Sequence, residues 1–138
     1  MSMETTVEQI DGAVPVTILA LDGELDASNF QELIDTVKRL YDDGTRRLII
    51  DLAGLRFMAS SGLVALHSIV QVMHGEEPLD PEGGWQALHS LGGEQQTDVR
   101  LAGPQPAVDR VLKRTGLDRM FVVHADRYTA IDAATAAA

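Results

Sequence analysis

Two adjacent serines, Ser60 and Ser61, carry the hydroxyl groups of this sequence that are best placed to take part in chemistry. An apolar pattern with helical spacing follows them and ends at Gly75; it consists of Leu63, Leu66, Ile69, Val70 and Met73. The pattern predicts that both serines lie at the N-terminus of a helix. A serine there can accept amide protons of the first turn, a structural role worth about 1 kcal/mol. The same position also tolerates a phosphate group.

A hydrolase could use Ser60 as its nucleophile, but the surrounding sequence does not support this alternative. A serine hydroxyl is a weak nucleophile at neutral pH unless a neighbouring base activates it. Ser60 is not the centre of a G-x-S-x-G motif, and no histidine or aspartate forms a recognisable triad signature with it. The sequence therefore favours a protein that binds a partner over an enzyme.

Metal and cofactor chemistry also lack their usual signatures. The sequence has no cysteine, and its four histidines are scattered, with His67 and His74 too far apart to form a ligand pair on one helix turn. The glycine pairs at 83–84 and 92–93 are not followed by the residues of a phosphate-binding loop. We expect neither a metal ion nor a cofactor.

The other side of the helix that follows the serines carries a different set of residues. Val64, His67 and Gln71 fall opposite the apolar stripe, and we expect this side to face a binding partner.

Composition restricts the class of protein and its partners. The chain has 138 residues, enough for one domain, and a formal net charge of −10, which repels nucleic acid and anionic lipid surfaces. No segment resembles a secretory signal, and the apolar stretches are too short or too interrupted to span a bilayer. The absence of cysteine fits a reducing compartment. We expect a cytoplasmic protein with neither nucleic acid binding nor direct membrane insertion.

Strand and helix patterns alternate along most of the chain. Strands are predicted near residues 5–10, 14–21, 47–52, 99–102 and 120–123. Helices are predicted at about 28–41, 60–75 and 107–115 and after Asp126; the first has Ser28 and Gln31 at the spacing of a capping box. This order predicts a single α/β domain over residues 1–138, with a four- to five-stranded mixed sheet packed against about four helices. Gly, Pro and acidic residues at about 76–98 predict an inserted flexible loop.

Three stretches, in this order, resemble the STAS family, which is named for sulfate transporters and anti-sigma factor antagonists. The first is the Gly-Glu-Leu-Asp motif at 23–26. The second runs from the strand at 48–52 to the Ser-Ser-Gly-Leu motif at 60–63, and the third from the strand at 99–103 to Thr115-Gly116-Leu117. The resemblance covers most of residues 14–132 apart from the 76–98 insertion.

The resemblance implies an anti-sigma factor antagonist, which binds an anti-sigma factor and releases the sigma factor. In such members a serine at the position of Ser60 is phosphorylated by the anti-sigma factor itself, a serine kinase of the histidine-kinase-like ATPase type, and a phosphatase reverses the modification. Ser61 is the second candidate for phosphorylation. The resemblance places further candidate contacts beside the switch serine, namely Glu24, Asp26, Ala59, Ser61 and Gly62, although carboxylates such as Glu24 and Asp26 are by default solvated.

One departure from the family pattern leaves a second function open. The aspartate that precedes the phosphorylated serine in the family is replaced here by Ala59. This replacement would suit an accessory STAS subunit of a stressosome or of a lipid-transport complex that is never phosphorylated.

Overall fold

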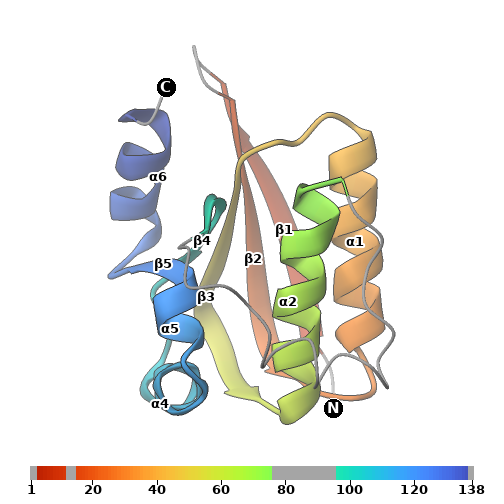
Figure 1. Cartoon of the computed structure of the whole chain (residues 1–138), viewed down its shortest axis with the longest axis vertical. Helices are drawn as coiled ribbons and strands as arrows, with labels where there is room; N and C mark the ends of the chain where they lie inside the picture. Colours follow the sequence, from red (N-terminus) through yellow and green to blue (C-terminus); the bar gives the residue numbers. More distant parts are fainter. Residues whose placement is uncertain (1–2, 12–14, 76–95, 137–138) are drawn as a thin grey trace.

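The computed structural model describes residues 3–11, 15–75 and 96–136. Five strands form one sheet in the order β1-β2-β3-β4-β5 (Figure 1). The strands are β1 (Met3–Ile10), β2 (Val16–Leu25), β3 (Leu48–Met58), β4 (Gln96–Ala102) and β5 (Phe121–His124). β1 runs antiparallel to β2, and the other neighbouring pairs are parallel. The mixed α/β sheet expected from the sequence is thus confirmed.

Helices cover both faces of this sheet. They are α1 (Phe30–Asp42), α2 (Ser60–Met73), α4 (Pro106–Thr115), α5 (Leu117–Met120) and α6 (Arg127–Ala136). The larger core cluster joins α1, α2, α4 and α5 to one face of the sheet. A smaller cluster joins Ala130 and Ala134 of α6 to the opposite face (Figure 1).

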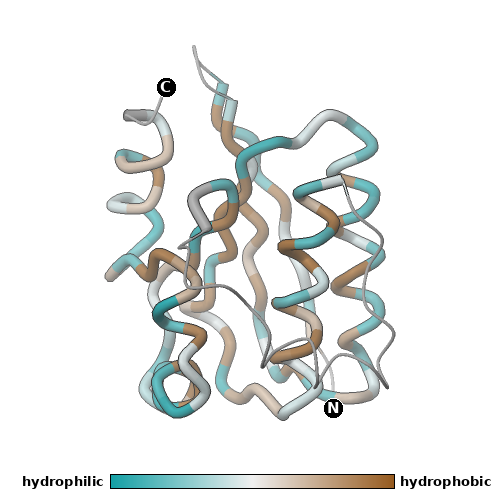
Figure 2. The backbone as a smooth tube through the Cα atoms, viewed as in Figure 1, coloured by the Kyte–Doolittle hydropathy of each residue, from teal (hydrophilic) through white to brown (hydrophobic). Residues whose placement is uncertain are grey.

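The core is aliphatic, as the low aromatic content predicts. The strand predicted at 47–52 is buried on both faces from Leu48 to Leu52, because it lies in the middle of the sheet between helix layers. Figure 2 shows hydrophobic residues along the central strands, whereas α1 alternates between hydrophobic and hydrophilic residues. Its buried residues are Leu33, Ile34, Val37 and Leu40, which recur at helical spacing.

Several elements differ from the sequence prediction in their limits. β2 and β3 continue beyond the predicted strands, to Leu25 and Met58, because the two strands pair with each other along this extension. β4 begins at Gln96, so the end of the loop predicted at 76–98 overlaps the start of this strand. The rest of the predicted loop, residues 76–95, lies outside the described part of the chain. The short helix α5 was not predicted.

The pairing of β2 with β3 contains an irregularity near the end of both strands. Gly23 pairs with Leu55 and Glu24 pairs with Phe57, so Arg56 is an extra residue in β3. Such a bulge shifts the alternation of inward and outward side chains by one position. The burial pattern follows this shift: Leu55 and Met58 are buried, whereas Arg56 and Phe57 between them are exposed.

Arg127 attaches α6 to the sheet. Its guanidinium donates to Asp51 Oδ2 through Nε at 2.7 Å and to Glu8 Oε2 through Nη1 at 3.0 Å. Asp51 lies in β3 and Glu8 in β1, so a single side chain connects three elements. Asp51 also accepts a hydrogen bond from the Ala53 amide, which satisfies its second oxygen.

Candidate partner-binding site

Ser60 is the first residue of α2 and is exposed. The preceding Ala59 is the N-cap residue, with an extended backbone (φ −77°, ψ 172°). Neither serine side chain accepts an amide proton of the first turn within the described part of the chain, so the capping role considered for them is not seen. The Ser60 hydroxyl is therefore accessible to another protein.

Ser61 differs from Ser60 in accessibility. Its residue is partly buried, and its Oγ is buried with no hydrogen-bond partner among the described residues. Of the two candidates for phosphorylation, Ser60 has the side chain that an enzyme can reach.

Glu24, near the end of β2, and Asp26, in the loop that follows this strand, lie directly beside the start of α2. The Ala59 amide donates to the Leu25 carbonyl at 2.8 Å, and Leu25 pairs with Met58. The position expected for this loop, next to Ser60, is thus seen in the structure. Glu24 and Asp26 are both partly exposed.

Hydrogen bonds within this loop hold it in one conformation. The Asn29 side chain donates to the Glu24 carbonyl at 2.8 Å and accepts from the Asp26 amide at 3.0 Å. Asp26 Oδ1 accepts from the hydroxyl and the amide of Ser28, at 2.5 and 2.9 Å. The Ser28 hydroxyl, and then its amide, lower the pKa of the Asp26 carboxyl below its usual value. Asp26 is thus an anion that stiffens the loop beside Ser60.

The capping box predicted for α1 is wrong. Helix α1 begins at Phe30 after Asn29, and Ser28 is engaged by Asp26 instead of by the helix. Gln31 points along the helix and donates to Asp35 at 3.1 Å. The capping pattern correctly identified the region in which α1 begins. The Ser28 hydroxyl, however, donates a hydrogen bond to the Asp26 carboxylate and does not cap the helix.

The expectation that Gly62, Val64 and His67 face a partner is contradicted by their burial. Val64 and His67 are each only 3% exposed, and Gly62 is buried. Helix α2 contains no charged residue, and a helix with so few polar residues is buried on nearly all sides. Gln71 is partly buried, and its Oε1 has no hydrogen-bond partner among the described residues.

Gly62 has a packing role. A Cβ at this position would lie 2.3 Å from Met58 Cγ and 3.1 Å from Leu25 Cδ2. Only a residue without a side chain lets the first turn of α2 approach the ends of β2 and β3 this closely.

Phe57 is a surface residue that the sequence analysis did not identify. Its side chain is 45% exposed, although it is large and apolar. It lies in β3 opposite Glu24 and shortly before Ser60. The sequence holds no direct signal for this exposure, because simple alternation from Leu55 would place Phe57 inside.

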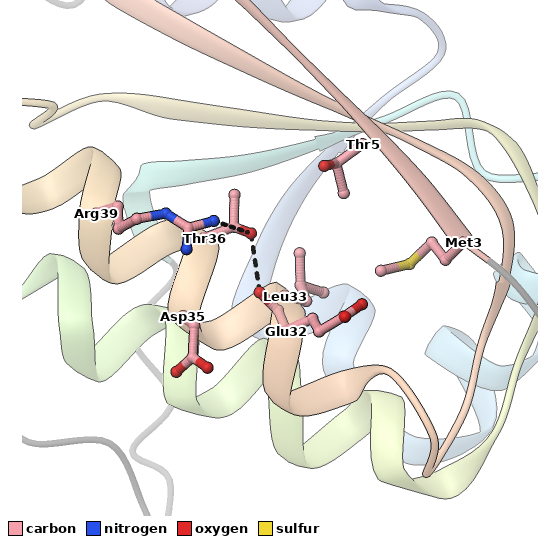
Figure 3. Close-up of a pocket in the computed structure, with 7 residues that line it drawn as sticks. All are labelled: Met3, Thr5, Glu32, Leu33, Asp35, Thr36 and Arg39. Carbon is pink, nitrogen blue, oxygen red and sulfur yellow. Dashed lines mark hydrogen bonds between the residues drawn. The ribbon is translucent and has the colours of Figure 1, made fainter.

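The described residues also form a surface groove beside α1. Figure 3 shows a groove of about 280 Å³ between β1 and α1, in which Thr36 accepts a hydrogen bond from Arg39 and donates to the Glu32 carbonyl. Its lining residues are Met3, Thr5, Glu32, Leu33, Asp35, Thr36 and Arg39. No predicted site residue lines this groove.

Within the described residues, no helix has the length and apolar character needed to cross a membrane.

Comparisons with known proteins agree with this geometry. The family model of the STAS domain matches residues 4–75. No curated protein matches the sequence. Among solved structures, an anti-sigma factor antagonist from Mycobacterium paratuberculosis is similar with a TM-score of 0.69 and 26% identity, over 97% of this chain and 95% of that one.

Two further structures share the fold at lower identity. A putative anti-sigma factor antagonist from Thermotoga maritima has a TM-score of 0.71 and 20% identity, over 95% of this chain and 94% of that one. The anti-sigma factor antagonist SpoIIAA in its unphosphorylated form has a TM-score of 0.59 and 20% identity, over 95% and 97%.

Proposed function

Because this chain belongs to the STAS domain family, we propose that it is an anti-sigma factor antagonist that binds an anti-sigma factor and thereby releases the sigma factor. The observation that carries the proposal is the exposed Ser60 at the first position of α2, with the end of β2 and the ordered loop after it, which includes Asp26, beside this serine. The 26% identical antagonist, matched over nearly the full length of both chains, supports the same role. In this proposal the whole chain acts as one binding domain and has no catalytic residue.

Regulation would come from phosphorylation of Ser60 by the bound partner, a serine kinase of the histidine-kinase-like ATPase type. The Ser60 Oγ would attack the γ-phosphorus of ATP on the kinase, ADP would leave, and the hydroxyl proton would pass to a base of the kinase. A phosphatase would return the serine by hydrolysis. The phosphate adds about −1.5 to −2 charges at the surface that meets the partner.

Such a phosphate is compatible with the fold but not with binding. Anions are stabilised near the N-terminus of a helix by the helix dipole and the free amides there, so α2 should remain intact. At a protein interface, a charge that loses its water without gaining a partner weakens association. Phosphorylation of Ser60 should therefore release the anti-sigma factor without unfolding the antagonist.

Ala59 supports a second candidate function. It offers no carboxylate beside Ser60, where the phosphorylated family members carry an aspartate. An unphosphorylated accessory subunit of a stressosome or lipid-transport complex would need no such group. In that case the same surface would bind a different protein constitutively.

A pull-down from native cell extract, followed by mass spectrometry, separates the two candidates. A kinase-like ATPase among the captured proteins supports the antagonist, whereas a transporter subunit supports the accessory role.

Calorimetric titration of the purified ATPase then tests the switch. Ser60→Ala should bind like the wild type, because it adds no charge, and Ser60→Glu should bind more weakly. Both should fold, since Ala59 and not Ser60 is the N-cap residue of α2 and an acidic group is favourable in the first turn of a helix. Thr6→Glu, on the exposed strand β1, is the control for an added negative charge. Equal affinities for Ser60→Ala and Ser60→Glu would contradict a charge switch at Ser60.

A further inference from the structure

We propose that Phe57 is the apolar anchor through which this protein holds the anti-sigma factor, so that phosphorylation of Ser60 acts by disrupting the contact of this ring. The inference rests on the proposed function and assigns the residue that supplies the affinity. Aromatic side chains, phenylalanine among them, are enriched in the buried core of protein interfaces, where a few central residues supply most of the binding energy.

The bulge at Arg56 is the feature that brings Phe57 to the surface. Without the extra residue, the alternation that buries Leu55 would also bury Phe57 and expose Met58. Instead Phe57 is 45% exposed and Met58 is 3% exposed. Bulges next to functional sites commonly redirect one side chain in this way. Single exposed apolar residues are common on protein surfaces, so it is the combination of this bulge with the nearby Ser60 that favours a role of Phe57 in binding.

Phe57 and Ser60 belong to one surface. Three residues of chain span at most about 10 Å, so the ring and the hydroxyl lie within a single interface patch. The Ala59 amide is fixed to the Leu25 carbonyl, which keeps the connecting segment in place. A phosphate on Ser60 retains a hydration shell, whereas burial of the Phe57 ring requires that water leave the same patch. The two states therefore exclude each other.

The surroundings of Phe57 fit an interface with another protein. Arg56 beside it is exposed and lies 3.9 Å from Asp22, with both side chains more than 60% exposed. Glu24 lies directly across the strand pair. A single apolar ring surrounded by hydrated charged groups matches the usual anatomy of a contact that can form and dissociate, with an apolar centre and a polar rim. The occupant is an apolar pocket on the anti-sigma factor, continuous with its contact to Ser60.

The chain provides two matched controls for a test. The described residues include two other large hydrophobic side chains that are exposed, Val7 at 43% and Tyr128 at 72%. Val7 pairs with Leu19, in the middle of β2 and away from the strand end beside Ser60. Tyr128 belongs to α6, which covers the face of the sheet opposite to α2 (Figure 1). Tyr128→Ala removes an exposed aromatic ring and Val7→Ala a smaller exposed apolar group, both outside the Ser60 surface.

Titration calorimetry of Phe57→Ala, Val7→Ala and Tyr128→Ala against the purified ATPase from the pull-down tests the inference. Phe57→Ala should weaken binding by about 30-fold or more, the loss typical of a central interface residue, and both controls should stay within about threefold of wild type. Phe57→Leu should recover part of the affinity. Phe57→Ala combined with Ser60→Glu should lose much less than the product of the two single effects, because both changes remove one contact. Unchanged thermal melting of each variant establishes that the fold is intact.

Three results would overturn the inference. If Phe57→Ala binds like wild type while Ser60→Glu binds weakly, the anchor is refuted and the antagonist function stands. If Phe57→Ala dissociates a dimer in sedimentation experiments and leaves the ATPase affinity unchanged, the ring serves a second copy of this chain. If neither Ser60→Glu nor Phe57→Ala alters binding, the proposed surface itself is wrong.

Discussion

Gly62→Ala sets two opposing effects on stability against each other. A Cβ at Gly62 would lie 2.3 Å from Met58 Cγ, 3.0 Å from Met58 Sδ and 3.1 Å from Leu25 Cδ2. Met58 is 3% exposed and Leu25 is fully buried, so neither can move into open solvent. Overpacking of this kind costs about 1–3 kcal/mol. Replacing glycine by alanine within a helix gains about 1 kcal/mol, so we expect a net loss of up to about 2 kcal/mol in the free energy of unfolding.

Urea denaturation, followed by far-ultraviolet circular dichroism, measures this difference through the unfolding midpoint. The close contact at Met58 Cγ is near the backbone of β3, so the strand end must shift as well as the side chain. Shortening Met58 in the Gly62→Ala background should make the double variant more stable than the sum of the two single losses predicts. A Gly62→Ala variant with a higher midpoint than wild type would refute the packing argument, because only the helix-propensity gain would then remain.

Two further predictions concern the α6 side of the sheet. Burial and, secondly, the Arg100 guanidinium lower the pKa of His124, which lies 3.3 Å from Arg100, so the folded protein binds fewer protons than the unfolded chain. The stability that depends on neutral His124 is therefore fully present above the ordinary histidine pKa of about 6.5 and is lost as the pH falls below it. Melting curves between pH 7.5 and 5.5 should show a smaller acid-induced loss of stability for His124→Gln than for wild type. An identical loss in both proteins would show that His124 is not its cause. Arg127→Met should lower the free energy of unfolding by about 2–3 kcal/mol, because it leaves the buried Asp51 without its cation. This loss is smaller than for a fully buried ion pair, since the Arg127 side chain is 25% exposed. Lys113→Met, which breaks the exposed pair with Asp109, should change the stability far less than Arg127→Met in the same urea titration. Similar losses for both variants would contradict the burial argument.

Periodic patterns in the sequence predicted the elements that position the site. The helical spacing after Ser60 placed the serines at the start of α2, and the apolar run from Leu48 to Leu52 identified the central strand. These predictions succeeded because each depends on which face of one element is buried, a property that neighbouring residues in the sequence encode.

The surface of the site could not be predicted in the same way. The exposure of Phe57 depends on how β3 pairs with β2, which involves residues far apart in the chain. The burial of Val64 and His67 depends on what packs against α2, so the helical pattern alone misplaced them. Helical spacing tells which residues share a face, but the tertiary packing decides whether a second face is also covered.

The attachment of α6 has a consequence for biosynthesis. The apolar residues Val16, Ile18 and Ile49 on one face of the sheet are covered by Ala130 and Ala134. The hydrogen bond between Arg127 and Glu8 spans 119 residues, and nearly the whole chain must therefore leave the ribosome before this face can close. Until residues 127–136 have emerged, a nascent chain presents a partly formed sheet with an open apolar side, the kind of surface that chaperones bind and that promotes aggregation.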